Sequence, residues 1–167
     1  ITTSNADNSK TEVKTKVIAS AVMDMGTKVT ATDALPGFKT VKPVTVTGSG
    51  HAGDEPANAT ITVTPTLGDF ASDVTWKLYK SATAITCTSS PVTTGTQYYD
   101  NATCTIPENA EVVIDAGGAA AKTLDVTVAY NTKDSYYLVV EYANKENQNT
   151  QVGKSFSIDM SFAPKAN

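Results

Sequence analysis

The sequence predicts an all-β protein with a β-sandwich or jelly-roll-like architecture. Threonine is the commonest residue and valine is abundant, and β-branched side chains favour the pleated surface of a strand over a helix. Apolar and polar residues alternate with a period of two through most of the chain, as in strands that bury one face. Turn residues separate these alternating segments, which is typical of sandwiches and jelly rolls. The 167 residues fit one domain of ordinary size.

The N-terminal half contains several of the alternating segments. Strands are expected at residues 19–25, 28–32, 44–47, 59–66 and 74–79. The segment 59–66 has the clearest alternation, with Ile61 and Val63 between threonines, and the segment 74–79 places Trp76 on a core face. Leu35, Pro36 and Gly37 suit a type II turn. One helical turn is expected within residues 67–72.

The C-terminal half continues the pattern. Strands are expected at residues 112–114, 124–130, 136–142 and 155–162, for a total of roughly eight or nine in the chain. Tyr136 and Tyr137 should point to opposite faces of their strand, one into the core and one onto a partly buried outer face. Residues 81–105, between these two groups of strands, are polar and contain both cysteines. Because the segment has few apolar side chains to bury, a covalent cross-link would help to stabilise it.

Charge and hydropathy exclude several classes of function. The formal net charge is −4, there is no arginine, and the 13 lysines are scattered, which argues against nucleic acid as a partner. No apolar run approaches the ~20 residues of a membrane span. No signal-peptide core is present, and Ile1 in first position suggests a mature chain from which a signal peptide was removed.

Cys87 and Cys104 are expected to form a disulfide. An even number of cysteines in an acidic, threonine-rich chain suggests an oxidising, extracellular compartment. The loop between them is short, and the chain-entropy model gives such a bridge about 3 kcal/mol. The alternative is two buried free thiols in a cytosolic protein.

Two sequons agree with an extracellular location. Asn58 and Asn101 each begin an Asn-Ala-Thr sequence, which matches the acceptor site for N-glycosylation. Asn101 lies in a polar stretch three residues before Cys104, and Asn58 opens an expected strand. The motif is short and threonine is abundant, so matches also arise by chance.

The residues of a catalytic or metal site are missing from the sequence. His51 is the only histidine and lies near Asp54 and Glu55 in a glycine-rich loop, where a solvated side chain is a better interpretation than a metal ligand. There is no H-E-x-x-H, G-x-S-x-G or calcium-loop motif. We therefore expect no enzyme activity, no cofactor and no metal site.

The N-terminal residues 1–18 differ from the rest of the chain. They are polar and contain neither Gly nor Pro, and they lead directly into the first strand of the expected domain. The sequence is accordingly divided into an extended arm, residues 1–18, and a sandwich domain, residues 19–167. The alternative interpretation of residues 1–18 is a disordered N-terminal tail, because chain termini are often disordered.

Three short motifs resemble the TasA and camelysin family of secreted fibre subunits, including the related archaeal bundling pilins. Residues 19–25, ASAVMDM, stand where that family has a motif like A-S-G-T-L-D-L, with Ala-Ser and Asp retained. The turn at Leu35, Pro36 and Gly37, followed by the Val-Thr-Val-Thr strand of residues 44–47, is also similar. The last motif is a closing strand with alternating apolar residues. Its members are Phe156, Ile158, Met160, Phe162 and Ala163.

The resemblance implies a structural subunit of an extracellular filament, a pilus or a biofilm-matrix fibre, assembled by donor-strand complementation. The arm of one subunit would add to a sheet edge of the next, and identical subunits would form an open head-to-tail polymer, with bundles of neighbouring filaments as a further level. The expected donor residues are Ile1, Thr11, Val13, Thr15 and Val17. The alternative is a monomeric cell-surface adhesin or carbohydrate-binding module with the arm as linker.

Overall fold

Two antiparallel sheets pack face to face and account for most of the chain. The computed structural model describes residues 2–4, 10–12, 15–23, 28–32, 34–95 and 97–165. The five-stranded sheet has the order β12 (Glu111–Gly117), β7 (Val74–Lys80), β14 (Lys133–Tyr142), β5 (Lys39–Ser49) and β3 (Ile18–Met23). The four-stranded sheet has the order β13 (Lys122–Val128), β6 (Ala57–Thr66), β15 (Ser155–Pro164) and β4 (Lys28–Thr32). The prediction of an all-β, sandwich-like fold is therefore confirmed.

The period-two pattern places one face of each strand in the core. Along β6, every second residue from Ala57 to Pro65 is buried while its neighbours face outward. Trp76 is 1% exposed, and its indole N–H donates to the carbonyl of Gly118 at 2.9 Å. Phe70 packs against Tyr142 and Phe156 with ring centroids 5.3 and 5.0 Å apart. Burial of these side chains is the main stabilising term of the fold.

The first two strands of the sandwich belong to different sheets. β3 pairs with the half of β5 from Val44 to Ser49 and forms one edge of the five-stranded sheet. β4 pairs with the first half of β15 and forms one edge of the other sheet. The chain thus crosses from one sheet to the other directly after β3.

The cysteine-containing segment covers part of the outer face of the five-stranded sheet. It consists of β8 (Thr86–Thr88) paired with β11 (Thr103–Thr105), and β9 (Pro91–Thr94) paired with β10 (Gln97–Asp100); we call residues 86–105 the flap. Beneath it, Ile85 packs with Tyr79 and Val139 in a second small core. The sequence predicts no strand in this segment, because its short strands are too polar to show alternation.

Other boundaries also differ from the sequence-based expectation. β5 begins at Lys39 rather than near Val44, because its first half pairs with β14 although Pro43 and two lysines obscure the alternation. The expected helical turn is the 3-10 helix η1 (Gly68–Phe70), and a second one, η2 (Asn149–Gln151), lies in the loop before β15. The turn at Leu35 is confirmed, since the Phe38 N–H donates to its carbonyl at 3.0 Å and Gly37 has φ +91°.

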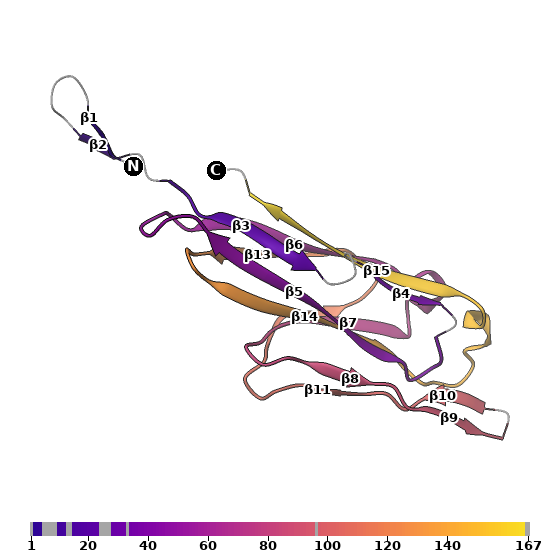
Figure 1. Ribbon diagram of the computed structural model, residues 1–167. Helices are drawn as coiled ribbons and strands as arrows, with labels where there is room; N and C mark the ends of the chain where they lie inside the picture. The colour runs from indigo at the N-terminus through magenta and orange to yellow at the C-terminus, as the bar shows by residue number, and fades with distance from the viewer. Residues whose placement is uncertain are drawn as a thin grey trace.

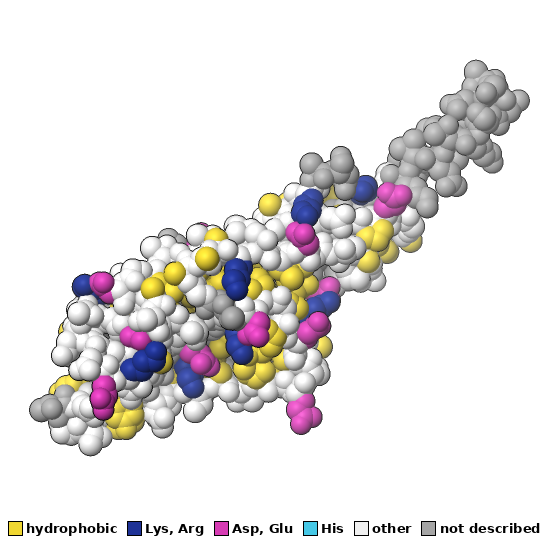
Figure 2. Space-filling view, turned by 180° about the vertical axis from the view of Figure 1, so that it is seen from behind, with side chains coloured by type: hydrophobic (Ala, Val, Ile, Leu, Met, Phe, Trp, Pro, Cys, Tyr) yellow, Lys and Arg dark blue, Asp and Glu magenta, His cyan; other side chains and the backbone are white. Residues whose placement is uncertain are grey.

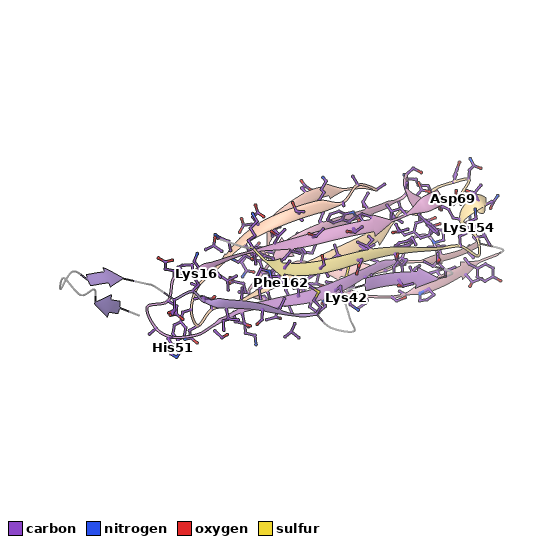
Figure 3. The ribbon with its side chains drawn as sticks, turned by 90° about the horizontal axis from the view of Figure 1, so that it is seen from above. Lys16, Lys42, His51, Asp69, Lys154 and Phe162 are labelled. Atoms are coloured by element: carbon purple, nitrogen blue, oxygen red, sulfur yellow. A yellow bond between two sulfur atoms is a disulfide. The ribbon has the colours of Figure 1, made fainter. Side chains whose placement is uncertain are left out.

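The sandwich is elongated, and its two ends differ (Figure 1). At one end, which we call the N-terminal pole, the short strands β1 (Thr2–Ser4) and β2 (Lys10–Glu12) pair with each other and lie beyond the sandwich. The opposite end, the distal pole, carries the β9–β10 hairpin and η2. In Figure 3, Lys16 and His51 accordingly lie at one end of the molecule, and Asp69 and Lys154 at the other.

Candidate functional site

The chain that leads from the arm into the sandwich is fixed to the loop after β5. The Val17 N–H donates to the Glu55 carbonyl and the Glu55 N–H to the Thr15 carbonyl, both at 2.8 Å. The Thr15 hydroxyl donates to the carboxylate of Asp54, and the His51 backbone N–H donates to the same carboxylate at 2.7 Å. These two bonds, the Thr15 bond first, hold the pKa of Asp54 below its usual value. The sandwich therefore holds the chain from Thr15 onward.

The three expected donor residues that the structure describes, Thr11, Thr15 and Val17, lie in different places. Val17 is 4% exposed and belongs to the core of its own sandwich. Thr15 contacts Asp54, and Thr11 lies in β2 opposite Thr3. Ile1 and Val13 lie outside the described residues. Val17 is thus a core residue of its own domain, and Thr15 is hydrogen-bonded to the same sandwich.

A groove of about 920 Å³ opens at the distal pole. Three segments far apart in the sequence form its walls: the turn that includes Leu35, the strand β10, and the loop between β14 and β15. Its surface is polar and apolar in similar measure, and side-chain amides and tyrosines are the commonest lining groups. These residues are Gln97, Tyr98, Tyr99, Tyr142, Asn144, Asn147, Gln148, Asn149 and Gln151.

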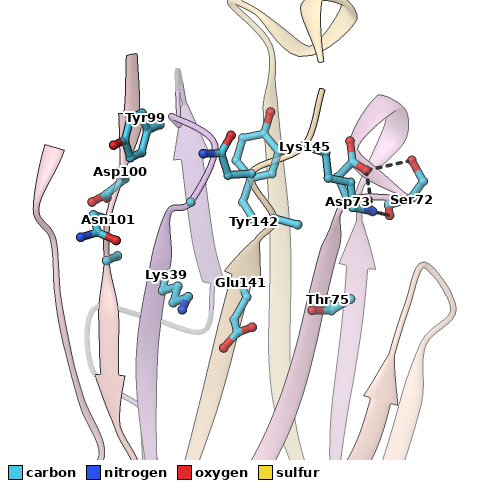
Figure 4. A pocket seen from close by; sticks show the side chains of 14 residues that line it. Lys39, Ser72, Asp73, Thr75, Tyr99, Asp100, Asn101, Glu141, Tyr142 and Lys145 are labelled. Carbon is cyan, nitrogen blue, oxygen red and sulfur yellow. Dashed lines mark hydrogen bonds and ion pairs between the residues drawn. The ribbon is translucent and has the colours of Figure 1, made fainter. Parts of the chain in front are cut away.

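A second hollow of about 380 Å³ adjoins the groove (Figure 4). Its side chains come from β10, β5, β14 and β7, and Figure 4 shows Tyr99 and Asp100 on one side and Asp73 and Lys145 on the other. Tyr99, Tyr142, Asn144 and Lys145 line both hollows. The two hollows therefore form one continuous concave surface at the distal pole, with polar and apolar parts.

A buried carboxylate fixes the loop that forms one wall of the groove. Asp73 accepts hydrogen bonds from the side-chain amides of Gln151 at 2.6 Å and Gln148 at 3.2 Å, and it forms an ion pair with Lys145 at 3.2 Å. The Gln151 bond is the main reason that the pKa of Asp73 lies below its usual value. The Gln151 amide also donates to the Asp69 carbonyl at 3.0 Å and accepts from the Tyr142 hydroxyl. The wall of the groove is thus held in place by its buried residues.

The opposite wall is fixed by a close approach of two backbones. The Asp100 N–H donates to the Pro36 carbonyl at 2.8 Å, and a Cβ added at Gly37 would lie 1.8 Å from the Asp100 carbonyl oxygen. The Asp100 carboxylate accepts from the Ser90 N–H at 2.8 Å and the Ser89 hydroxyl at 2.9 Å. The end of β10 is therefore attached to the turn at Leu35 and to Ser89 and Ser90, which lie between β8 and β9.

Some of the groove's side chains remain open to solvent. Tyr98 is 63% exposed, and Val152 is 78% exposed. Tyr98 belongs to the wall formed by β10, and Val152 to the wall formed by the loop before β15. An aromatic ring and an aliphatic side chain exposed beside amide groups form a surface able to bind either a polypeptide or a sugar.

The cysteines and the sequons lie on exposed segments. Cys87 and Cys104 are directly opposite each other in the β8–β11 pair and form a disulfide, as predicted. Asn58 is exposed on β6 and accepts from the Thr127 hydroxyl at 3.2 Å. Asn101 is exposed at the edge of the smaller hollow. Both asparagines are thus sterically accessible for modification.

The described residues contain no group of three or more His, Cys, Asp or Glu side chains arranged to hold a metal ion. His51 and Asp54 meet through the backbone N–H of the histidine. Figure 2 shows acidic and basic side chains interspersed over one face, with neither sign gathered in a patch. Within the same described ranges, none of the helices has the length and apolar character needed to cross a membrane.

Sequence reasoning did not find the residues that shape the distal pole. Asp73, Gln148 and Gln151 belong to polar segments in which nothing distinguishes a buried amide or carboxylate from a solvated one. Asp73 and Gln151 are separated by 78 positions. No local pattern predicts a bond over that distance.

Comparison of the chain with family models, with curated proteins and with solved structures gave no match. The two poles differ in one respect: one carries a segment that lies beyond the sandwich, and the other carries a groove.

Proposed function

We propose that this chain is a structural subunit of an extracellular filament, a pilus or biofilm-matrix fibre, in which the N-terminal arm of one copy engages the next copy head to tail. The observation that carries the proposal is the placement of the arm and the open groove at opposite poles. A contact between two different surfaces of identical chains generates an open polymer when the rotation from one copy to the next does not close a ring. The disulfide and the accessible sequons agree with an extracellular location.

The arm is able to exchange partners. In the single chain, β1 and β2 satisfy each other's backbone groups through the pairs Thr2–Glu12, Thr3–Thr11 and Ser4–Lys10. A two-stranded hairpin of this size has little stability by itself. When the arm opens, the same N–H and C=O groups become available to a sheet edge of a neighbour.

The length and polarity of the arm also suit this role. Fully extended, the residues before Thr15 span about 45 Å, at roughly 3.3 Å per residue, which exceeds the length of a strand such as β6. Residues 1–12 consist mostly of Thr, Ser, Asn and charged residues. A groove lined by amides and tyrosine hydroxyls offers such a segment hydrogen-bonding partners at the pole where it would enter.

The test is filament formation by the full chain and by a variant that lacks residues 1–12. The deletion stops before Thr15 and Val17, which the sandwich itself holds, so the shortened chain should fold. Negative-stain microscopy should show filaments for the full chain and monomers for the deletion. Filaments of normal length from the shortened chain would contradict the proposal.

A point variant tests the distal pole separately. Tyr98→Ala removes an exposed ring from the groove and should shorten filaments or slow their growth, whereas Tyr130→Ala, at a tyrosine 41% exposed and outside the groove, serves as the matched control. A synthetic peptide of residues 1–14 should cap growing ends and lower filament length in a dose-dependent way. Equal filament lengths for all of these samples would exclude the groove from assembly.

The second candidate is a monomeric adhesin or carbohydrate-binding module. The exposed Tyr98 ring beside the groove amides favours it, because sugars bind through aromatic stacking combined with polar contacts. A chain that stays monomeric at high concentration but binds a glycan array in a Tyr98-dependent way would support this function over the first.

A further inference from the structure

The edge strand β3 presents two large aliphatic side chains to solvent. Ile18 is 65% exposed and Val22 is 69% exposed, on either side of Ser20. Their alternate neighbours Ala19 and Ala21 face the core. The outer surface of β3 is thus an apolar strip on a strand whose only described partner is β5.

The other edge strands of the two main sheets carry features that discourage strand addition. β12 is interrupted by two register shifts against β7 and contains Glu111 and Asp115. β13 carries Lys122 and Asp125, and the sequence of β4 begins with Lys28. Charged residues and bulges are the usual protection of a sheet edge. β3 has neither: its six residues, IASAVM, are uncharged and pair with β5 without a shift.

We propose that β3 is an interface for a second copy of this chain, through antiparallel pairing of β3 with β3 about a two-fold axis at Ser20. In this register Ile18 of each copy lies opposite Val22 of the other, and Ser20 lies opposite Ser20. The pairing keeps the two cores on the same side, since residues of the same parity face each other. It joins two five-stranded sheets into one continuous sheet.

The side chains are complementary in this register. The two Ile18–Val22 pairs bring four exposed aliphatic side chains together on the outer face, where cross-strand aliphatic pairs stabilise a sheet. The six residues of β3 carry no charge, so this register brings no like charges together and matches the strip to itself in hydropathy.

The proposed β3–β3 contact is small, so it can hold two filaments together only if it is repeated many times along them. One pair of six-residue strands buries less surface than a stable isolated dimer needs. The role of the contact in bundling rests on the proposed function: copies arrayed along two filaments would repeat it many times, and avidity would then hold the filaments together. The antiparallel register implies that filaments joined in this way run in opposite directions.

Covalent trapping tests the register in the full chain. Ser20→Cys puts one thiol in each copy at the two-fold axis, where opposed Cα atoms lie about 4.5 to 5.5 Å apart, within the reach of a disulfide. Under mild oxidation we expect the Ser20→Cys variant to give roughly ten times more covalent dimer than the Thr123→Cys variant. Thr123 is an exposed residue on the edge strand β13. Peptide mapping should locate the new bridge between the two positions 20, with the bond from Cys87 to Cys104 unchanged.

A second substitution tests the aliphatic strip. Adding Val22→Lys to Ser20→Cys should lower the dimer yield roughly five-fold. Val112→Lys, at an exposed valine on the opposite edge of the same sheet, should leave it unchanged. Thermal unfolding of each variant shows that it is folded. Equal yields from positions 20 and 123, or a yield insensitive to Val22→Lys, would overturn the proposal.

The alternative partner for the β3 edge is the N-terminal arm of another copy. Mixing Ser20→Cys chains with Thr11→Cys chains separates the two cases. If the mixed dimer dominates and the dimer through position 20 is absent, β3 accepts the arm and the proposed symmetric pairing is wrong. If the symmetric dimer dominates, the interface is independent of the arm and would survive failure of the head-to-tail proposal.

Discussion

The side-chain amide of Gln151 donates a 2.6 Å hydrogen bond to the carboxylate of Asp73, which lies 78 positions earlier in the chain. Gln151 is 6% exposed and Asp73 is 9% exposed, so water competes little for either group. This bond joins the loop before β15 to the start of β7. It therefore helps to decide whether the distal groove keeps its shape.

Stability should fall on acidification in a way that depends on Asp73. Because the folded-state pKa of this carboxyl is lowered, its contribution is fully present above the unfolded-state pKa of about 4 and is lost as the pH falls through the lower folded-state pKa. Urea unfolding between about pH 6 and pH 2 should show this decline. Asp73→Asn should flatten the decline and lower the free energy of unfolding at the upper end of that range by about 1–3 kcal/mol. A parallel pH profile in wild type and variant would contradict the role given to Asp73.

Loss of the disulfide should destabilise the flap more than the sandwich. Cys87→Ser combined with Cys104→Ser should lower the free energy of unfolding by about 3 kcal/mol, because the bridge closes a loop with a sequence separation of 17. Hydrogen exchange should rise first in residues 86–105, which the bridge joins directly. Wild-type protein treated with a reductant serves as a second sample, and unchanged exchange in the flap would count against this prediction.

Gly37 should tolerate no side chain. Gly37→Ala brings a Cβ against the Asp100 carbonyl oxygen and keeps a backbone with φ +91°, so we expect a loss of about 2 kcal/mol or more in the free energy of unfolding. Gly95 also has a positive φ, +62°, but nothing lies within 4 Å of a Cβ added at that position. Gly95→Ala should therefore cost only about 1 kcal/mol. Equal losses would show that the close approach at Gly37 is relieved by movement.

Val17→Ala tests where the arm ends. Since Val17 is buried in its own sandwich, removal of its two methyl groups should lower the free energy of unfolding by about 2 kcal/mol. Val152→Ala, at a valine 78% exposed, should change it by less than about 0.5 kcal/mol. Chemical denaturation of the monomeric form lacking residues 1–12 provides the measurement. A stability unaffected by Val17→Ala would place Val17 in the arm.

The strands of the sandwich were predictable because each carries its own pattern. The alternation in residues 59–66 and 155–162 indicates strands with one buried face, and β6 and β15 bury those faces. The turn at Leu35 was predictable because Pro and Gly restrict it to few backbone conformations. The strands of the flap were not, because three or four mostly polar residues give no periodic signal.

Local residue preferences and a side-chain period of two were sufficient to predict the all-β class, the inward face of the clearly alternating strands and the two cysteines as partners. Other relationships could be read from the folded molecule alone: Val17 belongs to the sandwich, Asp73 meets Gln151, and the groove lies at the pole opposite the arm. These relationships join segments far apart in the chain. They exist only after the two sheets have packed and brought the loops at each end together.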